Sequence, residues 1–179
     1  MILAVGAHPD DIELGCGGTL AKSDSTKLTI SGGRGTIIDQ RFDAIPILDI
    51  IHLVEEFIER VQPNVVYTHY YHDLNLDHQI TARAVLTACR PVSSVKTIYS
   101  FEVPSSTEWG LEPFTPNVFV DITDTFNEKM KMLEAFKNEM RDYPHPRSVE
   151  AIKALAMYRG ACSGLKLAEA FYLVREIIE

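Results

Sequence analysis

Five short apolar runs constrain most strongly how this chain can fold. Most of them are continuously apolar rather than alternating with polar residues, which is typical of strands buried on both faces of a sheet. Helical patterns alternate with these runs, and this alternation predicts an α/β fold with a doubly wound, mostly parallel sheet. A chain of 179 residues is long enough for one such domain, expected over residues 1–179. The runs are Ile2–Val5, Leu28–Ser31, Asn64–His69, Lys96–Phe101 and Val118–Ile122.

The helices are expected between and after these runs, which gives a three-layer, Rossmann-like arrangement. Residues Ile45–Val61 carry apolar side chains at helical spacing, and Pro63 follows their end. Thr125 and Glu128 have the spacing of a capping box at a helix start. The further helices are expected over His78–Arg90, from Thr125 to about Arg141, and from the cap Ser148 to near Gly160–Gly164.

One segment departs from this alternation. Only Ser31-Gly32-Gly33-Arg34-Gly35 stands between Ile30 and Thr36, whereas a crossover between parallel strands needs about a dozen residues or more. We therefore expect a second βα unit that is shortened to a loop or hairpin, or a sequence that lacks residues of the natural protein.

Charge and cysteine content exclude several classes of function. The net charge of −8 and the pI near 5.2 argue against nucleic-acid binding, because no basic stripe is present to neutralise phosphates. No apolar run reaches the roughly 18 residues of a membrane span, and the N-terminus lacks a signal-peptide pattern. Cys16, Cys89 and Cys162 are interpreted as reduced thiols of a cytoplasmic protein, with Cys16 packed in a glycine turn rather than bound to metal. A homo-oligomer is compatible with such a domain.

The first cluster of chemically active side chains follows the first strand. In Ala7-His8-Pro9-Asp10-Asp11-Ile12-Glu13, one imidazole and three carboxylates lie within six residues, and the glycines after them predict a tight turn into a helix. Side chains at the carboxyl end of a strand in an open α/β sheet face the crevice where ligands bind. His8 and Asp11 can supply two metal ligands and Asp10 a free base, the parts that a hydrolytic metal site needs.

The second cluster follows the apolar residues Asn64–Tyr67 of the third strand. It is Thr68-His69-Tyr70-Tyr71-His72-Asp73-Leu74-Asn75-Leu76-Asp77-His78, and its last residue stands in or near the first turn of a helix. The two strand ends together offer His8, Asp11 and His78, and two histidines with one carboxylate are a common catalytic zinc set with an open position. Alone, each histidine would be interpreted as a polar loop or helix-start residue. Both clusters at one edge of the sheet favour a metal site.

These motifs resemble the PIG-L/LmbE family of zinc-dependent N-acetylglucosaminyl de-N-acetylases. The family carries an Ala-His-Pro-Asp-Asp motif followed by a Gly-Gly-Thr turn, and a later Asp-His pair before a helix. Further segments resemble a bacterial branch met in sugar and polysaccharide biosynthesis, so that the resemblance covers nearly the whole chain. They are Asp73–Gln79, Phe101–Trp109, Pro144–Ser148, Tyr158–Gly160 and Ala168–Phe171.

The resemblance implies an LmbE-like fold, Zn²⁺ on His8, Asp11 and His78, and Asp10 as the general base. Many family members have a histidine three residues before the last zinc ligand, where this chain has Asn75. An amide can donate a hydrogen bond but cannot act as an acid near neutral pH. His145 is therefore the first candidate for the acid that protonates the leaving amine, and His72 is the second. The alternative is that His145 is a surface-loop residue without a catalytic role.

Other positions have less specific interpretations. Asp77 is expected to orient a zinc-bound histidine through its second ring nitrogen. Asp39 matches an acidic position of the family that touches the sugar, or is a solvated loop acid. Arg34 is a candidate substrate-facing arginine, in a region where the family has a longer stretch. Trp109 and Tyr70 are candidates for stacking on a sugar ring, with packing as the alternative.

The expected function is removal of the acetyl group from an N-acetylated amino sugar or sugar conjugate, releasing acetate and a free amine. The expected partner is thus a small-molecule substrate. Two alternatives stay open: a metallo-amidase that acts on a non-sugar N-acyl compound, and a binding protein of the same fold that has lost catalysis.

Overall fold

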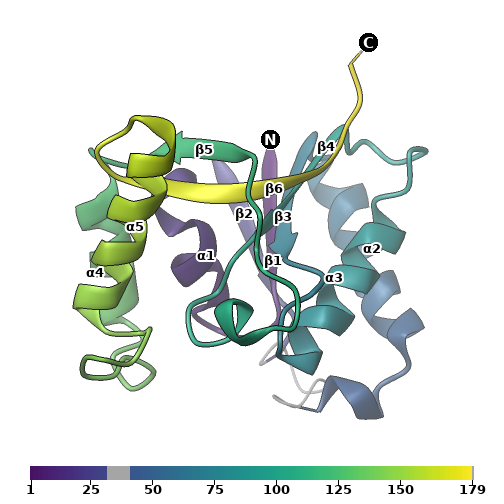
Figure 1. The fold of residues 1–179 in the computed structure, drawn as a ribbon. Coiled ribbons are helices and arrows are strands. Elements are labelled where there is room, and N and C mark those ends of the chain that lie inside the picture. Colours follow the sequence, from purple (N-terminus) through teal and green to yellow (C-terminus); the bar gives the residue numbers. More distant parts are fainter. Residues whose placement is uncertain (32–40, 179) are drawn as a thin grey trace.

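The computed structural model describes residues 1–31 and 41–178, and in them one mixed sheet forms the centre of the fold (Figure 1). The strand order is β2-β1-β3-β4-β6-β5. β1 pairs in parallel with β2 and β3, and β3 with β4, whereas β6 runs antiparallel between β4 and β5. The predicted α/β class with a mostly parallel sheet is confirmed. The strands are β1 Ile2–Gly6, β2 Ser25–Thr29, β3 Val65–His69, β4 Thr97–Phe101, β5 Val118–Asp121 and β6 Ala168–Glu176.

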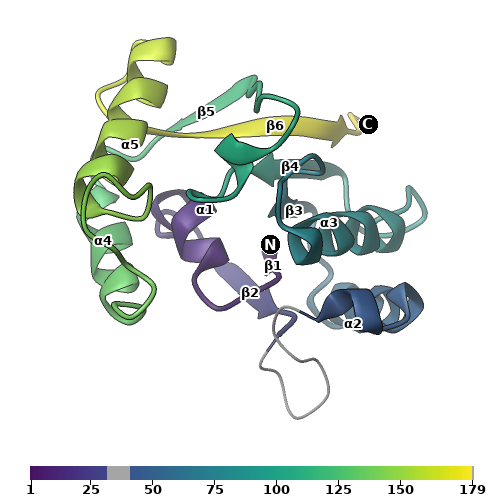
Figure 2. The ribbon, with the colours of Figure 1, turned by 60° about the horizontal axis from the view of Figure 1, so that its bottom comes forward.

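Helices cover both faces of this sheet (Figure 2). α2 and α3 enclose a core with residues such as Phe42 and Ile50 on one face, and α1, α4 and α5 enclose a second core around Phe101 and Phe171 on the other. Burying a large apolar side chain fully contributes about 1.5–3 kcal/mol. The helices are α1 Asp11–Leu20, α2 Ile47–Val61, α3 Leu76–Ala88, α4 Phe126–Glu134 and α5 Val149–Ser163, with 3₁₀ turns at Phe42–Ala44 and Thr107–Trp109.

The glycines after the first strand are not the tight turn that the sequence predicts, because they lie inside α1. The helix kinks at Cys16, whose φ is −144°. A side chain at Gly15 would collide with the ring of Phe101, and a Cβ at Gly18 would approach Ile122 to 2.9 Å. The glycines therefore let α1 pack closely against the sheet, which brings the start of the helix to the edge of β1.

Helix starts were predicted with mixed success. Ser148 caps α5 as expected, because its side chain accepts the N–H of Ala151 at 3.1 Å. The capping box at Thr125 is wrong: its hydroxyl donates to the Gly18 carbonyl at 2.7 Å, and α4 ends at Glu134. That hydroxyl instead ties the start of α4 to α1.

The C-terminal strand β6 was missed. Its first half carries the charged residue Glu169, and its second half alternates between exposed and half-buried side chains. The Glu169 carboxylate is nevertheless buried, because it accepts hydrogen bonds from Lys129 and from backbone amides of α1. The sequence does carry a local signal for this strand, the continuous apolar run Ala170-Phe171-Tyr172-Leu173-Val174, which the prediction overlooked.

The connection after β2 leads to α2 and then to β3, which lies beside β1. Arg34 and Asp39, predicted to face a substrate, lie outside the described residues. No helix among the described residues has the length and apolar character needed to cross a membrane.

Candidate metal centre

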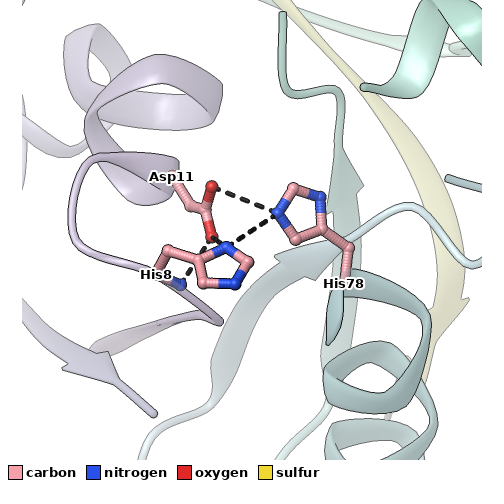
Figure 3. Close-up of side chains that lie close together, drawn as sticks. All are labelled: His8, Asp11 and His78. Carbon is pink, nitrogen blue, oxygen red and sulfur yellow. Dashed lines mark hydrogen bonds and ion pairs between the residues drawn. The ribbon is translucent and has the colours of Figure 1, made fainter. Parts of the chain in front are cut away.

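The two predicted clusters meet at the carboxyl edge of β1 and β3. These strands are neighbours, so the turn after β1 and the first turn of α3 lie together. Figure 3 shows His8, Asp11 and His78 pointing toward one another. His8 Nδ1 lies 3.2 Å from His78 Nε2 and 3.2 Å from Asp11 Oδ2, and Asp11 Oδ1 lies 3.3 Å from His78 Nε2. Two imidazole nitrogens and a carboxylate thus converge from segments 70 residues apart.

The chemistry of these donors fits a divalent metal ion. One ligand atom from each residue lies within 4.8 Å of the others. Asp11 and His78 are fully buried, and among the described residues Asp11 Oδ1 receives no hydrogen bond, its contact with His78 Nε2 at 3.3 Å being an ion pair only. Buried carboxylate oxygens normally have a partner. Two nitrogens and one oxygen with room for a fourth ligand are a set that zinc accepts.

The pKa values of these groups reflect their mutual contact. Burial alone would raise the pKa of Asp11, but the imidazoles of His78 and His69 hold it well below its usual range. Burial lowers the pKa of His78, and the carboxylates of Asp11 and Asp73 overcome this and raise it to about 9. Without a cation, the imidazole of His78 therefore holds a proton near neutral pH, and a metal must displace it.

Each candidate histidine ligand is backed by a carboxylate on its other ring nitrogen. Asp77 Oδ2 lies 3.1 Å from His8 Nε2, and its Oδ1 accepts the backbone N–H of Phe42. Asp73 Oδ1 lies 3.1 Å from His78 Nδ1, and the hydroxyls of Ser106 and Thr107 donate to Asp73. Such partners fix the orientation of metal-binding imidazoles.

Asp10 lies beside the three converging residues and is not one of them. It is 3% exposed and has a left-handed backbone with φ 95°, a conformation that non-glycine residues adopt at some energetic cost. Its Oδ2 lies 2.8 Å from Arg147 Nη1. Burial raises the pKa of Asp10 to about 7, although Arg147 opposes this increase. A carboxylate with such a pKa can take and return a proton near neutral pH.

A cavity of about 330 Å³ opens beside Asp10 and His8. Asn75 lines it, and its side-chain oxygen caps α3 by accepting the Asp77 N–H at 2.9 Å. The Asn75 amide nitrogen has no partner within the described part of the chain, so it is free to donate into the cavity. The lining consists of His8, Pro9, Asp10, Asn75, Ala135, Phe136, Asn138, Glu139 and Arg147.

The two predicted proton donors lie outside this lining. His145 Nδ1 accepts the backbone N–H of Arg147 at 3.1 Å, and its ring stands edge-on to Trp109. His72 is exposed and lies 3.4 Å from Glu112. The role of His145 stays a prediction.

The other candidates occupy packing positions. Trp109 is half exposed against His145, and Tyr70 packs edge-on against Phe114. Cys16 is fully buried, and burial together with the nearby Glu169 raises the pKa of its thiol well above the usual range. Cys16 is a packed residue, as expected, but it packs within α1 and not in a glycine turn.

Sequence reasoning placed His69 and Asp73 in the second cluster without giving either a role, and it gave Arg147 no role at the site. Asp73 and His69 belong to the second strand-end segment, where any polar side chain faces the ligand edge. Arg147 belongs to the Pro144–Ser148 segment, and it approaches Asp10 across 137 positions of sequence. No local pattern links two residues so far apart.

Comparisons with known proteins bear on this site. The chain matches the model of the GlcNAc-PI de-N-acetylase family, PIG-L, over residues 26–89, a range that includes His78. It is 32% identical to the uncharacterized deacetylase YaiS of Escherichia coli K12 over 174 aligned residues, covering 76% of this chain and 90% of that protein.

Solved structures share the fold. The conserved protein TT1542 of Thermus thermophilus has a TM-score of 0.76 at 22% identity, covering 99% of this chain and 96% of its own. The N,N′-diacetylchitobiose deacetylase of Pyrococcus horikoshii has a TM-score of 0.66 at 16% identity, covering 97% and 83%. GalB of Pseudomonas putida KT2440, a 4-carboxy-2-hydroxymuconate hydratase, has a TM-score of 0.68 at 19% identity, covering 99% of this chain and 97% of its own. The fold alone therefore does not specify the reaction.

Proposed function

The chain belongs to the PIG-L/LmbE family of deacetylases, and from this premise we propose that it is a zinc-dependent hydrolase acting on an N-acetylated amino sugar or sugar conjugate. The products are acetate and a free amine. The convergence of His8, Asp11 and His78 beside the carboxylate of Asp10, which is not part of the ligand group and is paired with Arg147, carries this proposal. The same parts, a metal site with an adjacent base, serve amide hydrolysis in other metallohydrolases.

His8, Asp11 and His78 hold the metal in this proposal. A bound zinc ion supplies a Lewis acid that polarises the amide carbonyl and makes water more acidic. Asp77 and Asp73 keep the two imidazoles oriented, so that the other nitrogen of each ring faces the centre.

Asp10 takes the proton of the attacking water. Its carboxylate lines the cavity, and the ion pair with Arg147 holds it in place. The pKa of about 7 suits a group that acts as a base first and as an acid later. General acid–base assistance of this kind typically contributes about 10²–10⁴-fold in rate.

Asn75 donates a hydrogen bond to the oxygen on which negative charge develops. Its oxygen is engaged with the Asp77 amide, so its NH₂ group is directed to another partner. A donor that is already in place stabilises charge without reorganisation when the reaction occurs.

The leaving amine needs a proton, and two residues can supply it. Asp10 carries one after the attack and lies in the cavity lining, whereas His145 accepts the backbone N–H of Arg147 and is not part of that lining. The positions of the two groups favour Asp10 as the proton donor. His145 remains the second candidate, and the activity of a His145 variant distinguishes between the two donors.

A sugar substrate suits the remaining lining of the cavity. Asn138 and Glu139 offer amide and carboxylate groups for hydroxyls, and Phe136 offers an apolar surface. The lining is mainly polar and charged, which suits a ligand rich in hydroxyl groups, and the aromatic ring of Phe136 can pack on a sugar. The Pyrococcus horikoshii relative of the same fold is named as a deacetylase of a sugar, N,N′-diacetylchitobiose.

The direct test incubates the zinc-loaded protein with a panel of N-acetylglucosamine and N-acetylgalactosamine derivatives and measures the released acetate and free amine. His8→Ala serves as the metal-site control. Release from a sugar by the wild type, and none by the control, is the expected result. A zinc-loaded protein that hydrolyses non-sugar N-acyl compounds alone would favour a metallo-amidase, and one inactive on every N-acyl compound would contradict the proposal.

A further inference from the structure

His69, the last residue of β3, is a fully buried histidine that the proposed reaction does not use. Its Nε2 accepts the backbone N–H of Ala7, the residue before His8, at 2.9 Å. Its ring stacks on that of His78, with centroids 4.0 Å apart and planes inclined by 17°. Nε2 also lies 3.3 Å from Asp11 Oδ2. One side chain therefore borders all three candidate ligand positions.

The hydrogen bond from Ala7 determines the protonation of this ring. Because Nε2 accepts an N–H, its lone pair is used, and the proton of the neutral ring must be on Nδ1. Nδ1 itself has no hydrogen-bond partner among the described residues.

A purely structural role accounts poorly for histidine at this position. An unpaired buried donor is costly, and an apolar side chain in β3 would fill the same space between Phe101 and His78 without that cost. What an apolar residue could not supply is the acceptor for the Ala7 amide. That amide begins the turn on which His8 and Asp11 stand.

We propose that His69 is a positioning residue of the metal centre. Its Nε2 holds the turn that carries His8 and Asp11, while its ring supports the plane of His78, so the two halves of the site keep one geometry. The inference rests on the proposed function only in requiring that this site binds a metal ion. It does not depend on which substrate is hydrolysed.

Two substitutions separate the hydrogen bond from Ala7 and the ring stacking on His78. His69→Phe keeps a ring against His78 but leaves the Ala7 amide without an acceptor. His69→Gln places an amide oxygen near the former Nε2, so it keeps the acceptor and loses the stacked ring. Thr68→Val is the matched control, because Thr68 is the adjacent, fully buried residue of β3 and its hydroxyl has no partner in the described chain.

The measurements are zinc affinity by competition with a chromophoric chelator and the d–d absorption spectrum of the Co²⁺-loaded protein. We expect His69→Phe to lower zinc affinity about 10–100-fold, as for other residues that orient ligands, and to alter the Co²⁺ spectrum. His69→Gln should recover most of the affinity, and Thr68→Val should match the wild type in both readouts. These readouts report the metal geometry and need no substrate turnover.

Wild-type zinc affinity and an unchanged Co²⁺ spectrum in folded His69→Phe would overturn the proposal. If that variant does not fold, the ¹⁵N spectrum of the wild-type imidazoles decides: a proton on Nδ1 of His69 supports the proposal, and a proton on Nε2 refutes it. A wild type that binds zinc but deacetylates no N-acyl substrate would refute the proposed function alone.

Discussion

Asp10→Asn tests most directly whether metal binding and proton transfer belong to different residues of the candidate metal centre. Asp10 contributes no atom to the converging ligand group, and its carboxylate lies 2.8 Å from Arg147 and lines the cavity. The amide keeps the size of the side chain and an oxygen that Arg147 can bond, but it cannot accept a proton at neutral pH. We therefore expect wild-type zinc content together with a large loss of turnover.

The expected magnitude follows from the role of a single proton acceptor. Loss of general-base assistance costs about 10²–10⁴ in kcat, which corresponds to about 2.7–5.4 kcal/mol of activation free energy. Zinc content per chain is measured by atomic emission spectroscopy, and kcat by acetate release with the best substrate of the panel.

Glu139→Gln is the matched control. It makes the same change of carboxylate to amide in the same cavity, and Glu139 lies 3.8 Å from the same arginine, Arg147. Because Glu139 is exposed and no hydrogen bond joins it to Asp10, we expect mainly a change in KM, with at most a small change in kcat through the pKa of Asp10, which the charge of Glu139 helps to raise. A kcat of Asp10→Asn within tenfold of the wild type, or a loss of its zinc, would refute the assignment of Asp10 as the free base.

Four further expectations concern the metal, the proton donor and the fold. His8→Ala should lose zinc at equal protein concentration, and stoichiometric zinc in that variant would exclude His8 as a ligand. His145→Gln should leave kcat within a few fold of the wild type if Asp10 returns the proton, whereas a loss of 10²-fold or more, the scale of a lost general acid, would assign the acid to His145. Zinc affinity should fall at least about tenfold for each pH unit below about 9, because protons compete with the metal for His78 and, at lower pH, for His8, whose pKa is also raised; calorimetric titrations across this range that show a flat affinity would contradict it. Glu169→Gln should lower the free energy of unfolding by about 3–5 kcal/mol in urea denaturation, because the buried ammonium of Lys129 lies 2.7 Å from Glu169 and loses its counter-charge; a change below about 1 kcal/mol would show that the pair is not coupled.

Much of the fold was readable from local pattern. The continuous apolar runs of β1, β3 and β4 were predicted within one or two residues of their observed bounds, because strands buried on both faces need apolar side chains at nearly every position. β6 was missed although Ala170–Val174 form a continuous apolar run; only the burial of the neighbouring Glu169, which Lys129 and amides of α1 satisfy, depends on distant partners. The glycines of α1 were assigned to a turn, because the ring of Phe101 that requires a glycine there comes from a distant strand.

The sequence by itself determined which side chains could form a metal centre. His8, Asp11 and His78 follow the ends of two apolar runs, and the ends of neighbouring parallel strands meet at one edge of a sheet. Ligand chemistry is a property of residue type, and the position after a strand is a property of local pattern. Both can be read along the chain.

Only the tertiary structure decided how that centre is supported. Asp73 backs His78, Arg147 meets Asp10, and His69 accepts the amide of Ala7. The last two contacts join residues 137 and 62 positions apart. They depend on distances and hydrogen-bond directions that exist only once the sheet has brought the strand ends together. No periodicity or spacing in the sequence encodes them.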